Sequence, residues 1–186
     1  MNMQRRLLFT RVFQLDANLI NAKQKVKAVN QLETWRDNGV ICLAASNAEL
    51  MKAQASGGAA AHRTKLDSRT FTVDEASEAE EEHIYSKVEA ILWSKAANDN
   101  HADDVAIVCE AIKWRAILVT DDGNSKPQPE GIYGNREKLR QEFGLQVLRP
   151  ESAVQFIRSK ISERDEFNAR VAALTGKLAP GWTGQD

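Results

Sequence analysis

The stretch that decides the fold reads DDVAIVCEAIKWRAILVTDDG and runs from Asp103 to Gly123. Its first half places Val105, Val108, Cys109 and Ile112 at helical spacing, which predicts a helix with one buried face. Its second half contains the uninterrupted apolar run 116–119, which is typical of a short, fully buried strand. We therefore expect a helix followed by a strand that ends on two carboxylates, Asp121 and Asp122.

The same alternation of helix and strand extends in both directions along the chain. Short apolar runs predict strands at 10–15, 40–44, 116–119 and 145–148. Periodic or capped segments predict helices at 21–37, from 46, at 74–95, from 103 to 112, at 135–143 and at 150–160, with a further helix carrying Phe167, Val171 and Leu174. Strands that alternate with helices indicate an α/β fold with a central, mainly parallel sheet.

Composition limits the size and the class of the protein. A chain of 186 residues with 42% hydrophobic and 27% charged residues is sufficient for one globular domain. The net charge of −1 argues against a tight, non-specific nucleic-acid binder, but it leaves room for an enzyme with a locally basic groove. The sequence contains no glycine-rich phosphate loop and no dinucleotide-binding fingerprint.

Cysteine usage and hydropathy indicate a cytoplasmic protein. The two cysteines, Cys42 and Cys109, both lie in apolar runs, where buried and reduced thiols are expected. No apolar run approaches the roughly 18 residues that a membrane-spanning helix needs. The N-terminal segment is basic but lacks the apolar core of a signal peptide.

Acidic residues follow the predicted buried segments with unusual regularity. Asp16 follows the first strand, Glu49 comes shortly after the second, Asp104 opens a helix, and Asp122 ends the third strand. In open α/β sheets, sites form beyond the carboxyl ends of the strands, so acids that are far apart in sequence can meet there. Carboxylate oxygens are the ligands that Mg²⁺ and Mn²⁺ prefer. The pattern therefore predicts a divalent-metal site.

Each acid also has a simpler structural interpretation. Asp104 could only cap a helix, Asp121 and Asp122 could only form a turn before Gly123, and Glu49 could be a solvated helix residue. Asp16 is harder to explain in this way, because an acid directly after an apolar strand tends to be partly buried. The metal-site prediction therefore depends on all four acids occurring together in the right order.

Four segments of the sequence resemble the PIN-domain nucleases, especially the VapC-type ribonuclease toxins of bacterial toxin–antitoxin pairs. These segments read LDANLI at 15–20, ASNAEL at 45–50, DVAIV at 104–108 and LVTDD at 118–122. The spacing from Asp104 to Thr120 and Asp122 matches that family, which favours Asp104 over Asp103 and Asp122 over Asp121. The sequence departs from the family at Ala17, where a small or hydroxyl residue is usual and the hydroxyl is missing.

The resemblance implies a three-layer α/β/α domain over residues 1–160, with a helical insertion at about 55–100. Residues 161–186 would then form a C-terminal helix and a loose tail. The resemblance also implies an endoribonuclease that depends on Mg²⁺ or Mn²⁺. The implied metal ligands and catalytic residues are Asp16, Glu49, Asp104 and Asp122, with Asn18, Thr120 and Asp121 as supporting polar groups.

The implied partners are an RNA substrate and a small antitoxin protein, with no membrane. A homodimer is left open, because Phe167, Val171 and Leu174 could bury against the same subunit or against another. The alternative function is a PIN-like module that binds RNA or protein through a weak or inactive site. The sequence does not say which RNA would be cut.

Overall fold

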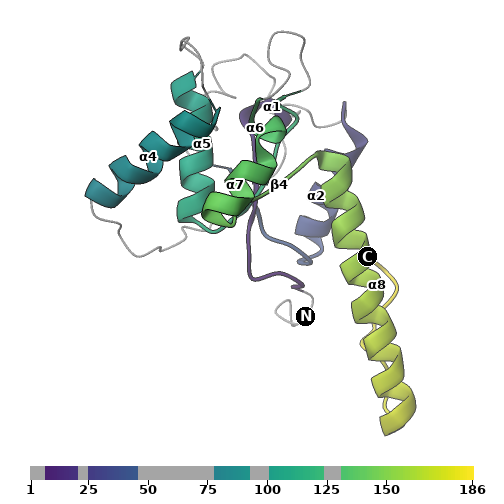
Figure 1. Cartoon of the computed structure of the whole chain (residues 1–186). Coiled ribbons are helices and arrows are strands. Elements are labelled where there is room, and N and C mark those ends of the chain that lie inside the picture. The colour runs from purple at the N-terminus through teal and green to yellow at the C-terminus, as the bar shows by residue number, and fades with distance from the viewer. Residues whose placement is uncertain (1–6, 21–24, 46–77, 93–100, 124–130) are drawn as a thin grey trace.

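The structure is a computed structural model, and it describes residues 7–20, 25–45, 78–92, 101–123 and 131–186. Within these ranges the chain forms a mixed α/β fold, with a parallel sheet among helices and one long helix extending away from the body (Figure 1). The predicted α/β class with a mainly parallel sheet is thus confirmed. No helix in the described ranges is long and apolar enough to cross a membrane.

The four strands occur where they were predicted, whereas the short helices at 17–20 and 131–134 were not predicted. The strands are β1 (Phe13–Leu15), β2 (Leu43–Ala44), β3 (Ile117–Val119) and β4 (Gln146–Leu148). The helices are α1 (Ala17–Ile20), α2 (Lys27–Asp37), α4 (Glu78–Leu92), α5 (His101–Lys113), α6 (Gly131–Gly134), α7 (Arg136–Phe143) and α8 (Pro150–Thr175).

The sheet has the strand order β2-β1-β3-β4, and every pair of neighbouring strands is parallel. Phe13 of β1 pairs with Leu43 of β2 on one side and with Ile117 of β3 on the other. The chain passes from β1 outward to β2 and then returns across β1 to β3, so the direction of winding reverses there. The carboxyl ends of β1 and β3 therefore flank the switch point at which α/β sheets commonly bind ligands.

Helices pack against the sheet through two separate apolar clusters. Phe13 and Leu15 belong to a cluster with α2 and α8, whereas Leu118 and Val147 belong to a cluster with α4, α5 and α7. Alternate residues of a strand point to opposite faces of a sheet, so the two clusters lie on opposite faces. Gln14, between Phe13 and Leu15, consequently lies on the α5 face and is completely buried.

Local sequence signals explain several helix boundaries. In α4 the buried residues Val88 and Leu92 lie one turn apart, as the predicted inward face requires. Helix α7 ends at Gly144, whose φ of 66° is in the left-handed region where glycine has no steric penalty. Helix α8 begins with Pro150, which suits a first turn because its missing N–H has no partner there in any case.

Some predicted boundaries are wrong. Strands β1 and β2 are shorter than the apolar runs 10–15 and 40–44 that predicted them. Helix α5 begins at His101, so Asp103 and Asp104 lie inside its first turn and neither precedes the helix as a cap. The helix predicted from residue 46 and most of the predicted insertion at 55–100 lie outside the described residues.

The C-terminal region differs most from its prediction. Helix α8 is continuous over 26 residues and passes through residue 160, where a break between two helices was expected. No proline or glycine interrupts the sequence between 151 and 175, which is why one helix forms. The segment 176–186 is not a loose tail, because its last residue, Asp186, makes side-chain contacts with Arg164 and Asn38.

Candidate functional site

A buried polar contact joins the carboxyl ends of β1 and β3. The hydroxyl of Thr120, the first residue after β3, donates a hydrogen bond to Oδ2 of Asp16, the first residue after β1, at 2.7 Å. Thr120 is fully buried and Asp16 is only 5% exposed. The backbone N–H of Asp16 also donates to the carbonyl oxygen of Val119 at 3.1 Å. Two of the predicted site residues are therefore held together at the switch point.

Asp16 also begins helix α1. Its carbonyl oxygen accepts hydrogen bonds from the N–H groups of Leu19 and Ile20, and its Oδ1 lies 3.4 Å from the backbone nitrogen of Asn18. A carboxylate in this position caps the helix and is favoured by the helix dipole. Asn18, predicted as a supporting residue, approaches Asp16 through its backbone, and its side chain is exposed.

Asp122 is tied to the same threonine. Its backbone N–H donates to Thr120 Oγ1 at 3.0 Å, so this hydroxyl accepts one hydrogen bond while it donates another to Asp16. The carboxylate of Asp122 accepts a hydrogen bond from the N–H of Ile132 at 2.8 Å, at the start of α6. The Thr-x-Asp pattern thus places Asp122 beside the Asp16–Thr120 pair and fixes one of its carboxylate oxygens.

The position of Asp122 requires a glycine at residue 131. A Cβ atom on Gly131 would lie 2.5 Å from Oδ2 of Asp122 and 2.6 Å from Cα of Gly123. The φ of Gly131 is +38°, which is also unfavourable for a residue with a side chain. Gly131 therefore permits the backbone to approach the Asp122 carboxylate.

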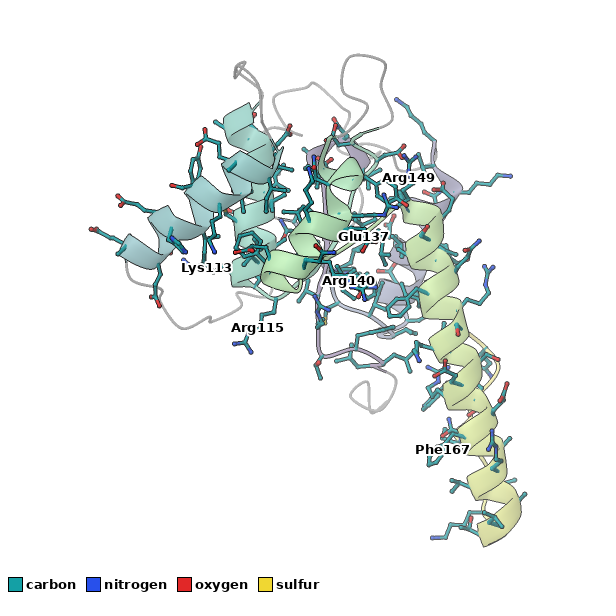
Figure 2. The ribbon with its side chains drawn as sticks, in the orientation of Figure 1. Lys113, Arg115, Glu137, Arg140, Arg149 and Phe167 are labelled. Carbon is teal, nitrogen blue, oxygen red and sulfur yellow. The ribbon has the colours of Figure 1, made fainter. Side chains whose placement is uncertain are left out.

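Asp104 lies on α5 near the same edge of the sheet. The side-chain amide of Gln14 donates to the carbonyl oxygen of Ile107 at 3.3 Å and connects β1 to α5. Helix α5 runs antiparallel to the strands, since it ends at Lys113, shortly before β3 begins at Ile117 at the opposite edge of the sheet. Figure 2 labels Lys113 and Arg149. From the Gln14–Ile107 contact, Asp16 is about 7 Å further along β1 and Asp104 about 4–5 Å further along α5, both toward the carboxyl edge.

The described residues do not by themselves form a complete metal site. Within the described ranges, no three side chains of His, Cys, Asp or Glu are grouped so that they could hold a metal ion. The fourth predicted ligand, Glu49, lies outside those ranges. The donor set at the edge consists of carboxylate and hydroxyl oxygens, which is the chemistry that Mg²⁺ and Mn²⁺ prefer. The four-carboxylate site stays a prediction.

A basic cluster, which sequence reasoning did not identify, lies beside the acids. Arg149 directly follows β4, and its guanidinium is 3.4 Å from the carboxylate of Asp121. The guanidinium carbons of Arg149 and Arg136 each lie 4.5 Å from the centroid of the Tyr133 ring, at cation–π distance. The backbone N–H of Tyr133 donates to the carbonyl oxygen of Asp122, which connects this cluster to the acidic edge.

The sequence contains a signal for the basic cluster and also for the buried amide of Gln14, neither of which was predicted as part of the site. Arg149 occupies the same position after its strand that Asp16 occupies after β1, and the rule that selected the acids applies equally to a basic residue. Gln14 is a polar residue between Phe13 and Leu15 in a strand that is completely buried. A buried amide inside such a strand indicates a specific partner, because an unpaired amide in the interior is costly.

The thiol on α5 is unsuited to nucleophilic chemistry at neutral pH. Burial raises the pKa of the Cys109 thiol to about 11, and the negative charges of Glu110 and Glu81 add to the effect. Because the thiolate is the reactive form, Cys109 is inert at neutral pH.

Comparison of the chain with protein-family models, with curated proteins and with solved structures finds no match. The inference of function consequently depends on the residues at the carboxyl edge and on their chemistry.

Proposed function

We propose that the protein is a metal-dependent endoribonuclease with a PIN-like, three-layer arrangement, acting at the carboxyl ends of β1 and β3. The observation that carries the proposal is the 2.7 Å hydrogen bond from Thr120 to the buried carboxylate of Asp16. It joins two residues of the family-like pattern across the switch point of the sheet. Capping of α1 does not require the additional contact with Thr120 on the neighbouring strand end.

The Asp16 carboxyl group lies at the start of α1 and accepts the hydrogen bond from Thr120, so its orientation is fixed. In our proposal Asp16, Asp104 and Asp122, together with Glu49, hold Mg²⁺ or Mn²⁺. When bound, such an ion neutralises a phosphodiester and lowers the pKa of an attacking water. Thr120 then acts as a positioning residue for Asp16.

The basic cluster gives the proposed site a means to bind RNA. Arg149 and Arg136 place guanidinium groups beside the acids. One guanidinium group can donate two parallel hydrogen bonds to the oxygens of a phosphate. With a net charge of −1 the chain has no general attraction for RNA, so a local cluster must supply it. Asp121, which was predicted as a supporting residue, contributes here by pairing with Arg149.

Cleavage of a labelled RNA with added Mg²⁺ or Mn²⁺ tests the proposal. We expect Asp16→Asn to reduce cleavage at least about 100-fold and to abolish the rise in melting temperature that the metal causes. The matched control is Asp103→Asn, which removes an acid from the same end of α5 as Asp104 without touching the proposed ligands. Unchanged cleavage by the Asp16→Asn protein, or no thermal shift at millimolar metal, contradicts the proposal.

A second candidate is a PIN-like module that binds RNA or protein without cutting. It is favoured by the basic cluster of Arg136 and Arg149 on Tyr133, which needs no metal to bind a phosphate group. Fluorescence anisotropy with a labelled RNA separates the two candidates. The module predicts RNA binding that Arg149→Ala weakens, with no cleavage at any metal concentration, whereas the ribonuclease predicts both binding and cleavage.

We further propose that the ribonuclease is the toxin of a toxin–antitoxin pair. Expression of the chain alone should then arrest bacterial growth, and co-expression of a small protein from the adjacent reading frame should restore it. Asp16→Asn is the control, because it should remove the toxicity. Normal growth during expression of the unaltered chain contradicts this part of the proposal while leaving the cleavage assay decisive for the activity.

A further inference from the structure

Exposed apolar residues are concentrated at the end of α8. Of the six large hydrophobic side chains that are exposed in the described ranges, four belong to this region: Phe167 (66%), Val171 (40%), Leu174 (87%) and Leu178 (99%). Phe167, Val171 and Leu174 are spaced by four and three residues, so they share one face of the helix. We call these three residues the apolar stripe. Phe167 projects from the part of α8 that extends beyond the body (Figure 2).

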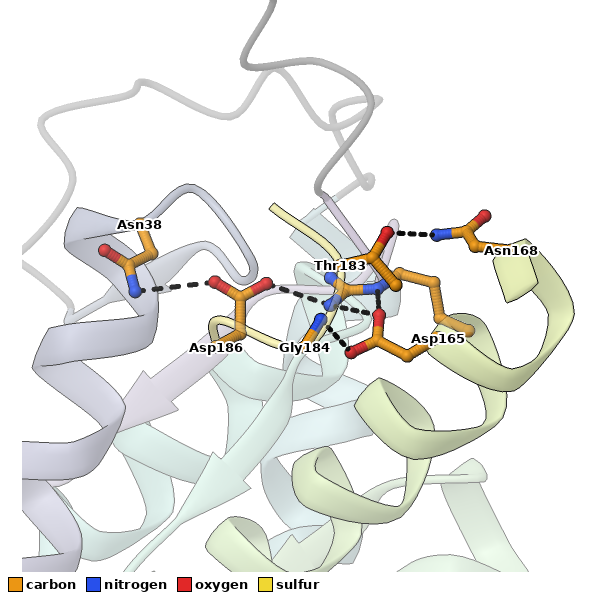
Figure 3. A network of polar contacts seen from close by, with 7 residues as sticks. Asn38, Asp165, Asn168, Thr183, Gly184 and Asp186 are labelled. Atoms are coloured by element: carbon orange, nitrogen blue, oxygen red, sulfur yellow. Dashed lines mark hydrogen bonds and ion pairs between the residues drawn. The ribbon is translucent and has the colours of Figure 1, made fainter. Parts of the chain in front are cut away.

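The segment 176–186 folds back along this protruding half, and we call its contacts with α8 the brace. The guanidinium of Arg164 lies 2.9 Å from the carboxylate of Asp186, and the N–H of Gly184 donates to Asp165 at 2.8 Å (Figure 3). The side chain of Asp186 is completely buried by these contacts. Arg164 also stacks on the ring of Trp182, with the guanidinium carbon 4.5 Å from the ring centroid.

The brace and the apolar stripe occupy adjoining faces of α8. The first half of the helix packs on the core through residues such as Ile157 and Ile161, and nothing after Ile161 is buried. Arg164 and Asp165 continue that same face, so the brace takes the place of the core there. At about 100° per residue, Val171 lies roughly 20° around the helix from Arg164, Phe167 roughly 60° and Leu174 roughly 80°. The brace therefore borders the stripe, and Phe167 and Leu174 stay largely exposed, at 66% and 87%.

The charges along the protruding half indicate what covers the stripe. Glu163 and Glu166 lie beside its beginning, where they pair with Lys160 and Arg170 of the same helix at 2.7 and 3.6 Å. Arg170 and Lys177 lie beside its later part, and the sequence from 167 to 178 contains no acid. A second copy running antiparallel would place the acidic end of each helix beside the basic end of the other. A parallel copy would place like charges together, which is unfavourable.

We propose that the apolar stripe is a self-complementary dimer interface, in which the protruding halves of two α8 helices pack antiparallel. Phe167 of one copy then lies against Leu174 of the second copy, and Glu163 of one lies near Lys177 of the other. A two-fold axis makes each contact occur twice, as in most homodimers. The inference is independent of the proposed ribonuclease function, because the stripe belongs to the protruding helix and the acids belong to the sheet edge.

Sedimentation of the whole chain over a range of concentrations tests the interface. The chain of 20.7 kDa should associate to about twice that mass as concentration rises. Phe167→Glu and Leu174→Glu should each shift the protein to monomer. Tyr85→Glu on α4 is the matched control, because Tyr85 is also an exposed large side chain, at 39%, and it should leave the dimer intact. Circular dichroism and thermal unfolding confirm that each variant is folded.

Charge exchange tests the antiparallel arrangement. Glu163→Lys and Lys177→Glu should each weaken the dimer at least about threefold, and the double variant should restore it, since opposite charges face one another again. A chain that stays monomeric at all concentrations overturns the proposal. Equal dissociation by Tyr85→Glu, or no restoration in the double variant, overturns it as well.

Discussion

The carboxyl edge of the sheet buries polar groups, whereas the protruding end of α8 exposes apolar ones. At the edge, a carboxylate and a hydroxyl are buried, with Asp16 5% exposed and Thr120 fully buried. At the protruding end, Leu174 is 87% exposed. Buried polar groups and exposed apolar groups are the informative exceptions to hydrophobic burial. The proposed catalytic site and the proposed dimer interface depend on these two separate exceptions.

The two regions should also respond differently to mutation. At the edge, the polar groups are built into the sheet, so a broken contact cannot be relieved without unfolding. At the protruding end, the bracing segment can detach while the rest of the fold persists, so the cost to global stability is limited. Substitutions in each region can therefore confirm or contradict the comparison.

The largest effect should come from Gly131→Ala. The added methyl would lie 2.5 Å from Oδ2 of Asp122, and the backbone φ of +38° adds strain. We expect the free energy of unfolding to fall by about 2–4 kcal/mol, measured by chemical denaturation. The control is Gly144→Ala, where nothing lies within 4 Å of the new Cβ and about 1 kcal/mol of backbone strain is expected. Equal losses for both variants would show that the edge is not tightly packed.

The second effect concerns the hydroxyl of Thr120. Thr120→Val keeps the shape of the side chain but removes the hydrogen bond to the buried Asp16 carboxylate. We expect a loss of about 1.5–3 kcal/mol in the free energy of unfolding. Thr120→Ser retains the hydroxyl and loses a methyl group, so it should be the less damaging variant. A more stable Val variant than Ser variant would mean that packing, and not the hydrogen bond, matters here.

A smaller global effect is expected from Arg164→Ala at the protruding end. The substitution removes the contacts with Asp186 and Trp182, and the bracing segment should detach locally. We expect only about 1 kcal/mol of global destabilisation, together with faster hydrogen exchange at the Gly184 amide. Arg170→Ala, which removes only an exposed pair with Glu166, is the control. A global loss as large as that of Gly131→Ala would contradict the comparison.

The last prediction concerns the chemical reactivity of the Cys109 thiol on α5. Its raised pKa of about 11 lies above the reference value of 9.0, so the folded state holds the neutral thiol across that window. At pH 8 the folded protein should contain up to about 100-fold less thiolate than the unfolded chain, and the reaction with a disulfide reagent should be correspondingly slow. The measurement uses a Cys42→Ser background, and the rate should rise as pH increases toward 11. A fast reaction at pH 8 would show that burial does not protect α5.

Much of the fold could be predicted from the sequence because its signals are local. The apolar run 116–119, the spacing of Val88 and Leu92, and the glycine at 144 each indicate an element without knowledge of the rest of the chain. The continuity of α8 could not be predicted in this way. The second half of the helix packs against the segment 176–186, which has few apolar residues. Trp182 and Asp186 bind through charge and an aromatic ring, and such contacts leave no periodic pattern.

The candidate site was predictable in part for a different reason. Parallel strands bring their carboxyl ends to one edge, so Asp16 and Thr120 could be placed together from topology alone. Their hydrogen bond depends on side-chain geometry, which spacing does not specify. Gln14 and Arg149 have a positional signal in the sequence, but the position alone does not identify their partners, the Ile107 carbonyl group and the Asp121 carboxylate. The metal and the RNA stay predictions, since they depend on groups beyond the described contacts.

The bond between Thr120 and Asp16 has a consequence for how the protein folds. The two residues are separated by 104 positions in the sequence. The strands that precede them, β1 and β3, are nevertheless neighbours in the sheet. Closing so long a loop is entropically costly, and folds dominated by such contacts form slowly. During synthesis on the ribosome, the edge between β1 and β3 is therefore assembled only after most of the chain has emerged.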